Sequence, residues 1–404
     1  MHDAKANPDY LSRDQVLERL GIKQQTLYAY VSRGFIRSIA HPDGRSSLYA
    51  REDVEKVRQR SALRTNWPVF ESSITEITED GPRYRGRLAV DLARARVRFE
   101  NVAEFLWDGE LAEEPIAWGR QRDPRALGSL LKSAARLHPE SHVVQLMTVG
   151  ISALGISAGV RRERIRAGLT PIVSARGVMR ALGGIMGFLG AEKRYVPLED
   201  GEALAAAVAR RLGSSDSETI NAALIVVGDH ELNPATFAAR VAASGNSDLH
   251  SCIGAALNTH YGTSVGRACD RLEGLFTPQS GAAEMMARAS RMLDASRSLP
   301  GFNHPLYPDG DPRARYLREL AVAVGGTRPA VRDILVVLSQ LENEYGLVPS
   351  VECGLVLLCR ALGLPERSAA GLYALGRTAG WVAHVLEQRL AGFVIRPRAR
   401  YAAT

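Results

Sequence analysis

GDHELNPATFAARV, residues 228–241, places an acidic residue and a histidine between a glycine and a proline, inside a long stretch of Ala-, Leu- and Arg-rich sequence. Polar interruptions of this kind lie at the edges of predicted helices, where side chains can converge on a ligand instead of being lost in packing. Four further segments share this character: LPGFNHPLYPDGDPRAR (299–315), GLVPSVECGL (346–355), ALGRTAGWVAHVLEQR (374–389) and VIRPRARY (394–401). The recurrence predicts one ligand site assembled from distant segments.

Helical patterns dominate the sequence around these segments. Short Gly and Pro punctuation separates the apolar runs and β-branched alternation is scarce, which predicts an all-α domain of about 340 residues. A break at LRTNWPVFESS, residues 63–73, precedes this domain. Just after the break, ITEITEDGPRYRGRLAV alternates around Asp80 and Gly81, which predicts a small hairpin.

The composition is that of a globular protein. A chain of 404 residues with 46% apolar and 24% charged residues can bury large cores, and its length suggests two or three folding units. No apolar run approaches the roughly 20 residues that cross a bilayer. The amino terminus, MHDAKANPDYLSRD, lacks a charged region that leads into an apolar one. We therefore expect a cytoplasmic protein without a membrane span.

The cysteines argue against a zinc site or a disulfide framework. The chain has no CxxC spacing and no partnering pair of histidines. Buried reduced thiols are therefore expected, together with no bound metal and no bound cofactor. The four cysteines are Cys252, Cys269, Cys353 and Cys359.

The amino-terminal part carries a clear local pattern. Ser12 and Gln15 form a capping box, which predicts a helix over residues 13–20. Gly21 supplies a turn, and a second helix is expected over residues 23–32, with Leu27 and Val31 facing inward. Two short helices joined by a Gly-containing turn are a helix-turn-helix.

The next segment, FIRSIAHPDGRSSLYA, gives two extended runs around Pro42, Asp43 and Gly44, which predicts a hairpin wing. A further helix is expected from about Arg51. This order resembles the winged helix-turn-helix of MerR-type and excisionase-type DNA-binding domains. The first 65 residues also hold twelve Lys and Arg against eight Asp and Glu, out of a net charge of +7 for the whole chain. The surplus suggests an anionic partner, although ordinary solvated surfaces show it too.

The resemblance implies that residues 1–65 bind DNA. The outward side chains of the second helix would meet the major groove, where Gln suits adenine edges and Thr suits the thymine methyl. These residues are Lys23, Gln24, Gln25, Thr26, Tyr28 and Tyr30. Arg33, Arg37 and Arg45 would hold phosphates. A helical hairpin used for dimerisation or protein contact is the alternative.

The five polar segments, in their order, resemble citrate synthase. That family's sequences have a DHE-N stretch, a GPLHGGA turn, a PGFGH…DPR loop, an NVD motif, an ARTxGW helix and a terminal RPR. The resemblance covers about residues 68–404 within a domain over residues 66–404, and family members preceded by a helix-turn-helix are familiar. It implies a mostly helical homodimer in which a large domain and a small domain, residues 266–365, close on the substrates.

Family enzymes add the methyl carbon of acetyl-CoA to the keto carbon of oxaloacetate, and thioester hydrolysis then releases citrate and CoA. Oxaloacetate carries two carboxylates and a carbonyl, so its site needs forked cations and a hydrogen-bond donor. The resemblance places Arg313 and Arg377 on the carboxylates, His230 on the oxoacid and His304 on the keto group. Arg396 matches the arginine that a partner subunit contributes. Singly, each is more often a surface charge or a structural histidine; five in register predict a retained anion site.

The acyl-donor side departs from the family. YGTSVGRA, residues 261–268, aligns with GPLHGGA and puts Val265 at the histidine that donates to the thioester carbonyl. Losing such a donor typically costs about a hundred- to a thousandfold in turnover. Glu352 stands at the aspartate that takes the methyl proton, and its extra methylene moves the oxygens by roughly 1 Å, which can cost about a hundredfold. Smaller departures cluster nearby, at Pro305, Arg267, Cys269 and Cys353.

Two histidines could take the place of the lost donor. His260 and His250 lie close to Val265 in sequence, and Ser264 could donate weakly; the alternative is that both histidines lie elsewhere. The favoured function is an acyltransferase that condenses acetyl-CoA or another acyl-CoA with oxaloacetate or a related oxoacid, with low activity toward acetyl-CoA. The alternative is an inactive DNA-binding regulator that senses citrate, oxaloacetate or a related carboxylate.

Overall fold

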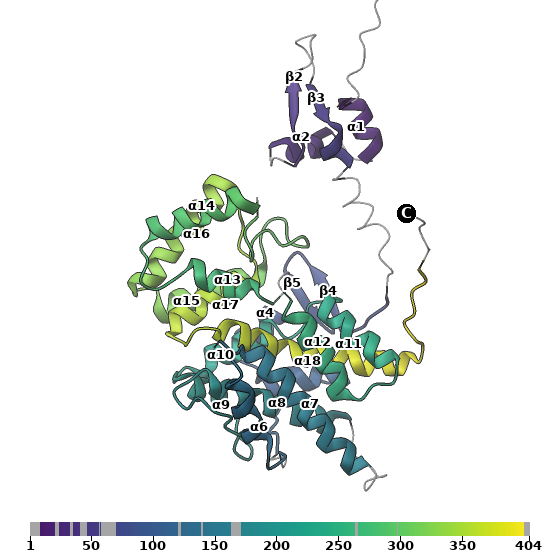
Figure 1. Cartoon of the computed structure of the whole chain (residues 1–404), viewed down its shortest axis with the longest axis vertical. Helices are drawn as coiled ribbons and strands as arrows, with labels where there is room; N and C mark the ends of the chain where they lie inside the picture. Colours follow the sequence, from purple (N-terminus) through teal and green to yellow (C-terminus); the bar gives the residue numbers. More distant parts are fainter. Residues whose placement is uncertain are drawn as a thin grey trace, which may run out of the picture. The chain divides into compact units, whose positions relative to one another are not determined.

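The computed structural model divides the chain into two compact units, Met1–Glu71 and Ser72–Thr404 (Figure 1). Each unit is described by itself. None of the helices in the described part of the chain is long and apolar enough to span a membrane. The described residues are 9–20, 24–32, 35–40, 47–55, 57, 70–119, 123–138, 140–162, 171–262, 266–296 and 298–399.

The first unit combines short helices with a three-stranded antiparallel sheet of order β1-β3-β2. The predicted pair of extended runs is present as β2 and β3, in register Ser38↔Tyr49, whereas β1 was not expected. Residues 51–55 are helical, as expected. The elements are β1 (Tyr10–Ser12), α1 (Arg13–Leu20), α2 (Gln24–Ser32), β2 (Ser38–Ala40) and β3 (Ser47–Ala50).

The predicted capping box at the start of α1 is confirmed. Ser12 N–H donates to Gln15 Oε1 at 3.0 Å, and Gln15 N–H donates to Ser12 Oγ at 3.4 Å, so each residue satisfies a backbone donor of the other. Leu27 is fully buried and Val31 packs half-buried against the same core. The buried residues of this small core are Leu11, Val16, Leu27, Ile36, Tyr49 and Val54.

The second unit opens with an antiparallel sheet that confirms the predicted hairpin. β4 (Thr75–Thr78) pairs with β5 (Gly81–Tyr84), and Thr78 lies opposite Gly81 across the two-residue turn. Gly81 has a φ of +118°, a conformation that favours glycine. A third strand, β6 (Arg87–Leu88), continues the sheet and was not predicted.

The rest of the second unit is helical, as the sequence predicted. Its helices are α4 (Ala89–Arg94), α5 (Phe99–Asp108), α6 (Leu127–Ala135), α7 (Val143–Arg162), α8 (Pro171–Ile185), the 3₁₀ helix η1 (Met186–Phe188), α9 (Leu204–Leu212), α10 (Ser217–Val226), α11 (Pro234–Ser244) and α12 (Leu249–His260). They continue with α13 (Ala268–Leu275), α14 (Ala282–Ser296), α15 (Pro312–Gly325), α16 (Pro329–Tyr345), α17 (Val351–Leu362) and α18 (Ser368–Ala391). All four cysteines are buried and free, as predicted.

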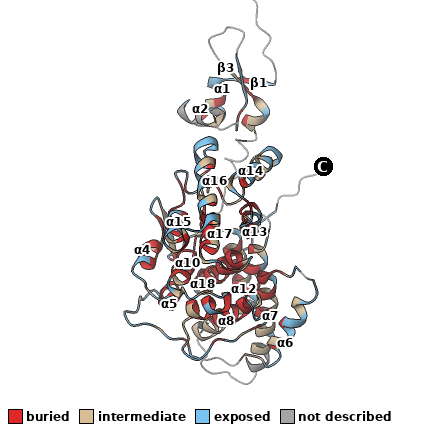
Figure 2. Cartoon of the chain, turned by 90° about the vertical axis from the view of Figure 1, so that its left-hand side faces the viewer, coloured by how far each residue is buried: buried red, intermediate tan, exposed pale blue. Residues whose placement is uncertain are grey.

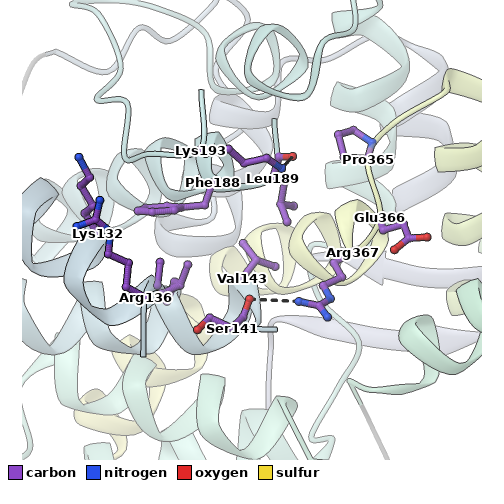
Figure 3. A pocket seen from close by; sticks show the side chains of 12 residues that line it. Lys132, Arg136, Ser141, Val143, Phe188, Leu189, Lys193, Pro365, Glu366 and Arg367 are labelled. Atoms are coloured by element: carbon purple, nitrogen blue, oxygen red, sulfur yellow. Dashed lines mark hydrogen bonds between the residues drawn. The ribbon is translucent and has the colours of Figure 1, made fainter. Parts of the chain in front are cut away.

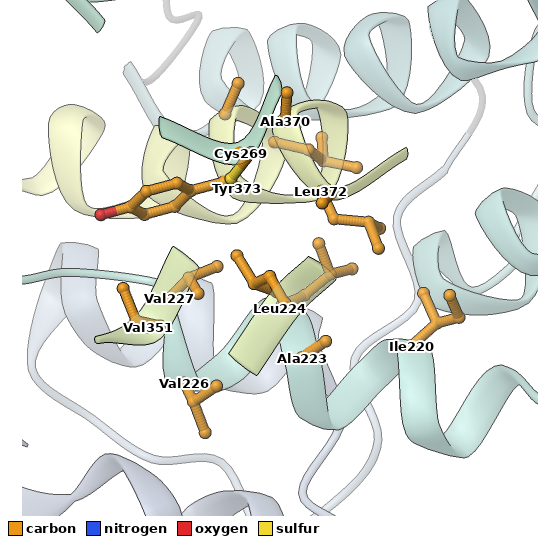
Figure 4. Packing of buried hydrophobic residues seen from close by; sticks show 14 of the residues in the cluster. Ile220, Ala223, Leu224, Val226, Val227, Cys269, Val351, Ala370, Leu372 and Tyr373 are labelled. Carbon is orange, nitrogen blue, oxygen red and sulfur yellow. The ribbon is translucent and has the colours of Figure 1, made fainter. Parts of the chain in front are cut away.

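Helix α18 runs through the core and is buried along most of its length (Figure 2). Its apolar side chains meet those of α10, and Cys269 and Val351 join the same cluster (Figure 4). Gly380 lets the chain after α10 approach closely, because a Cβ there would lie 2.6 Å from Gly228 O and would also overlap Asp229 Oδ1. Gly380 N–H instead donates to Gly228 O at 3.0 Å. This contact holds the DHELN segment against α18.

Glu273 is a buried carboxyl in α13. Its Oε2 accepts the N–H of Arg367 at 2.7 Å, at the start of α18. Burial raises the pKa of Glu273 to about 7, against the lowering effects of that N–H and of Arg360. In the unfolded chain the carboxyl ionises near its ordinary pKa, so folding becomes less favourable as pH rises from about 4.5 to about 7.

We expect Glu273→Gln to stabilise the protein at pH 8 by up to about 3 kcal/mol and to have little effect at pH 5. The amide removes the cost of ionising a buried group and still accepts the N–H of Arg367. Urea unfolding at the two pH values measures the difference. Glu113→Gln, at an exposed site, is the control and should show no such gain. An equal gain at both pH values would contradict the expectation.

Candidate active site

Asp311 holds the start of α15, the start of α17 and the guanidinium of Arg313 together. It is the N-cap of α15, where its Oδ1 accepts Arg313 N–H at 3.0 Å. Its two oxygens also accept Arg313 Nε at 3.0 Å and Nη2 at 2.8 Å, and Oδ2 accepts Val351 N–H at 3.1 Å. Asp311 and Arg313 are almost fully buried. Burial alone would lower the pKa of Arg313, but the ion pair with Asp311 raises it, so the guanidinium stays charged.

Three aromatic side chains gather beside Arg313. The ring centroids of His230 and His304 are 5.0 Å apart, and those of His304 and Tyr307 are 5.2 Å apart. His230 Nε2 lies 3.0 Å from the hydroxyl of Tyr307, whose ring centroid is 5.7 Å from Arg313 Cζ. The predicted residues His230, His304 and Arg313 are therefore neighbours, although they come from two segments.

Arg377 enters this cluster from α18. Its Nη1 lies 3.2 Å from Asp229 Oδ1, and its Nη2 donates to Thr236 Oγ1 at 2.7 Å. Asp229 Oδ2 is also held by Thr75 Oγ1, at 2.6 Å, and by His384 Nε2, at 3.2 Å. Burial alone would raise the pKa of Asp229, but His384 and Arg377 lower it to about 2. An ionised carboxylate therefore anchors Arg377.

Both arginines keep buried N–H groups for a ligand. Within the described part of the chain, Arg313 Nη1 and Arg377 Nε have no hydrogen-bond partner, and both side chains are at most 1% exposed. Buried polar groups are normally hydrogen-bonded, so these cationic donors are available to an added acceptor. Carboxylates suit such donors because charge-assisted hydrogen bonds to guanidinium are strong and directional. The cluster can bind a small carboxylate.

The two histidines of the cluster are neutral at physiological pH. Burial and the charge of Arg313 lower the pKa of His304 to about 4, and the same causes lower that of His230 well below its ordinary value. A neutral imidazole can donate one hydrogen bond without adding charge. His304 is only half-buried, so it can reach a ligand beside Arg313.

Glu352 stands in the first turn of α17, directly after the backbone that Asp311 holds. Burial raises the pKa of its carboxyl, against the lowering effects of its own N–H and of Arg313. The hydroxyl of Tyr373 lies 3.5 Å from Glu352 Oε1. A partly buried carboxylate with a raised pKa is suited to take a proton from a substrate.

The remaining residues predicted for the oxoacid site and the acyl-donor site are found in different parts of the second unit. Arg396 is exposed on the C-terminal segment, next to Ile395, whose N–H donates to Ser244 Oγ at 3.1 Å. None of the contacts described above joins Arg396 to the cluster around Arg313. His250 lies in the first turn of α12 beside Asp248, with 3.4 Å between Nδ1 and Oδ1. His260 ends α12 and is buried. Val265 and Ser264 lie outside the described residues.

The residues predicted to contact DNA are only partly described. Gln24 and Tyr28 are exposed on α2, and Gln24 Nε2 donates to the hydroxyl of Tyr28 at 2.6 Å. Arg37 is exposed but forms an ion pair with Asp53, with 2.7 Å between Nε and Oδ2. Tyr30 is not outward as expected; it is half-buried and packs against the small core. Lys23, Arg33, Arg45 and the side chains of Gln25 and Thr26 lie outside the described residues.

A separate pocket of about 670 Å³ lies elsewhere on the second unit (Figure 3). Basic side chains dominate its polar lining, and Arg367 Nη1 donates to Ser141 O at 3.2 Å. Its charged residues are Lys132, Arg136, Lys193, Arg367 and Glu366. None of the residues that line it belongs to the cluster around Arg313, so this pocket is not the predicted oxoacid site.

Sequence reasoning missed Tyr307, Asp311, Asp229 and Tyr373. Asp311 carried a usable signal, because an acidic residue directly before Pro at the start of a helix is an N-cap pattern. Tyr373 also had one, since it lies one helical turn before Arg377 and so shares its face. The partners of Asp229 lie in remote segments and gave no local signal.

The sequence and the fold both match known proteins. The family profile described as "Citrate synthase, C-terminal domain" matches residues 63–398. The chain is 28% identical over 342 residues to the 2-methylcitrate synthase of Mycobacterium tuberculosis, covering 79% of this chain and 84% of that protein. It is 29% identical over 280 residues to citrate synthase 2 of Bacillus subtilis, covering 68% and 69%.

The fold is similar to that of Thermoplasma acidophilum citrate synthase in a ternary complex with carboxymethyl coenzyme A and oxaloacetate. The TM-score is 0.70 at 21% identity, covering 84% of this chain and 95% of that one. The protein is mainly helical, and its candidate site combines buried arginines with neutral histidines. The chain belongs to the citrate synthase family of condensing enzymes, because the family profile matches well over half of it.

Proposed function

We propose that the protein is a citrate synthase-type acyltransferase that condenses acetyl-CoA or another acyl-CoA with oxaloacetate or a related oxoacid. The observation that carries this proposal is the pair of buried arginines, Arg313 and Arg377, each of which keeps an unpaired N–H group. Arg313 lies beside the ring of Tyr307 in the histidine cluster, and Arg377 pairs with Asp229, the residue before His230. Two forked cations match two carboxylates, and a neutral histidine matches the carbonyl between them.

In the proposed reaction Arg313 and Arg377 bind the carboxylates, His230 orients the oxoacid and His304 donates a hydrogen bond to the keto oxygen. Glu352 takes a proton from the carbon beside the thioester, and that carbon attacks the keto carbon. Water then cleaves the thioester and releases CoA. Closure of a small domain, residues 266–365, would exclude bulk water. In a homodimer, Arg396 from the second copy would complete the anion site.

The proposal leaves two acyl donors to compare, acetyl-CoA and propionyl-CoA. The relatives include proteins named 2-methylcitrate synthase as well as citrate synthase, so propionyl-CoA is tested beside acetyl-CoA. Thiol release from each CoA ester in the presence of oxaloacetate measures condensation. We expect slow turnover with acetyl-CoA, because the family's donor histidine is replaced at Val265. No thiol release with either ester would overturn the proposal.

The oxoacid site has its own test. Oxaloacetate and citrate should raise the melting temperature of the wild-type protein, because they bind only the folded state. Arg313→Lys keeps a positive charge beside Asp311 but loses the two parallel N–H donors of the guanidinium. We expect its Kd for oxaloacetate to rise at least tenfold. Arg94→Met removes an exposed arginine that pairs with Glu319 and should leave the Kd unchanged. An unchanged Kd in Arg313→Lys would contradict the assigned role.

A second function is favoured by one feature of the first unit, where α2 presents Gln24 and Tyr28 to solvent. On this alternative the protein is a DNA-binding regulator whose oxoacid site senses a carboxylate, and the residues predicted to contact DNA carry the binding. The ligand would have to bind two states with different affinities. Ligand-induced stabilisation without any thiol release, together with DNA binding that citrate or oxaloacetate alters, would favour this function over condensation.

A further inference from the structure

Tyr373 lies between the two halves of the candidate active site. It precedes Arg377 by one turn of α18, so the two side chains leave the helix on the same face. Its ring packs with the cluster that includes Cys269 and Val351 (Figure 4). Its hydroxyl donates to Glu352 Oε1 at 3.5 Å. Tyr373 therefore places a proton donor beside the carboxylate that is the proposed base.

The ring of Tyr373 is held by a second aromatic side chain. The ring of His260 meets it edge to face, with centroids 4.9 Å apart, and meets Trp381 at 5.5 Å. Within the described part of the chain neither ring nitrogen of His260 has a hydrogen-bond partner, and no ion pair or hydrogen bond joins His260 to Glu352. Burial lowers the pKa of His260 to about 3, so it stays neutral. His260 thus supports Tyr373, and Tyr373 is the side chain that reaches Glu352.

The proposed reaction needs a hydrogen-bond donor beside Glu352, the proposed base. When a base removes a proton from the carbon beside a thioester, negative charge develops on the carbonyl oxygen, and a placed donor stabilises it. Burial and the neighbouring Glu352 raise the pKa of Tyr373, so the phenol keeps its proton. A protonated tyrosine in an apolar site is an established kind of donor to such an oxygen.

We propose that the hydroxyl of Tyr373 turns its proton from Glu352 Oε1 to the thioester carbonyl oxygen of the bound acyl-CoA as Glu352 is protonated and the enolate forms, and so takes the place of the imidazole absent at Val265. This inference rests on the proposed condensation. Glu352 accepts the proton as the C–H bond breaks. The electron pair of that C–H bond forms the C=C bond, while the π electrons of the carbonyl group move to its oxygen. Tyr373 keeps its proton throughout. The enolate carbon then bonds to the keto carbon of the oxoacid.

Tyr373→Phe tests the inference, because it removes one oxygen and keeps the ring against His260. Proton exchange beside the thioester of acetyl-CoA or propionyl-CoA is followed by NMR in D₂O. Malate is present as a dicarboxylate without a keto carbon, so enolisation is measured without condensation. We expect exchange and kcat for thiol release to fall about a hundred- to a thousandfold. The Kd for oxaloacetate should stay within twofold, since the oxoacid contacts are retained.

Tyr316→Phe is the matched control, because Tyr316 is another buried tyrosine, packed against Arg94 outside the site. Its exchange rate should equal that of the wild type. If the wild type exchanges and Tyr373→Phe retains more than a third of that rate, the inference about Tyr373 is wrong and condensation stands. If the wild type neither exchanges nor releases thiol, the condensation proposal fails and the inference fails with it. A weakened Kd with unchanged exchange would also overturn it, since it would place Tyr373 on the oxoacid.

Discussion

Replacing Asp311 with alanine should lower the free energy of unfolding of the second unit by about 3 to 5 kcal/mol, because the change leaves Arg313 as a buried, unpaired charge. The same carboxylate accepts four hydrogen bonds, from the backbone N–H groups of Arg313 and Val351 and from two nitrogens of the Arg313 guanidinium. Its loss also removes the cap of α15. Chemical unfolding followed by circular dichroism measures the effect.

Asp216→Ala is the matched control for this prediction. Asp216 is the N-cap of α10, where its carboxylate accepts Thr219 N–H at 2.9 Å and Thr219 Oγ1 at 2.7 Å, and it holds no buried cation. We expect it to cost about 1 kcal/mol, the ordinary value of an aspartate cap. Equal losses in the two variants would show that Asp311 is only a cap. They would remove the argument that it holds Arg313 in place.

The second large effect is expected at Glu352. Glu352→Gln should slow thiol release by about a hundred- to ten-thousandfold, the usual contribution of a placed general base. Stability should not fall, because burial raises the pKa of Glu352 and so disfavours its ionised form in the folded state. Oxaloacetate should bind as before, since its carboxylates are assigned to the arginines. Steady-state kinetics and thermal unfolding measure the two readouts.

Glu352→Asp separates a chemical role from a structural one. It restores a carboxylate on a shorter side chain, and we expect it to retain far more activity than the amide. Misplacement by about 1 Å can still cost up to a hundredfold. Equal activity of Glu352→Gln and the wild type would mean that another group takes the proton. Loss of oxaloacetate binding in Glu352→Gln would instead assign Glu352 to the oxoacid.

Much of the local structure was predictable because it depends on residues that are close in sequence. The capping box at Ser12 and Gln15 and the hairpin around Asp80 and Gly81 were both predicted correctly. The helical character of the second unit followed from apolar periodicity and Gly and Pro punctuation. The approach of His230, His304, Arg313 and Arg377 was also predicted, from the order of their motifs rather than from local pattern.

The network that supports these residues was not predictable. Thr75 and His384 meet at Asp229 from positions 154 and 155 residues away, and no periodicity connects such positions. The close approach at Gly380, where a side chain would collide with the backbone of Gly228, is likewise seen only in the structure. Sequence also could not show that Tyr30 is half-buried or that Arg37 forms an ion pair with Asp53.

The sequence by itself determined the helices, the hairpins and the identity of the cationic and acidic side chains, because backbone preferences and caps act within a few residues. Tertiary structure alone decided which of those side chains are paired and which keep a free donor. Burial removes water from all of them, so each buried charge must find a partner among remote segments. The unpaired N–H groups of Arg313 and Arg377, and the hydroxyl of Tyr373 beside Glu352, result from that packing.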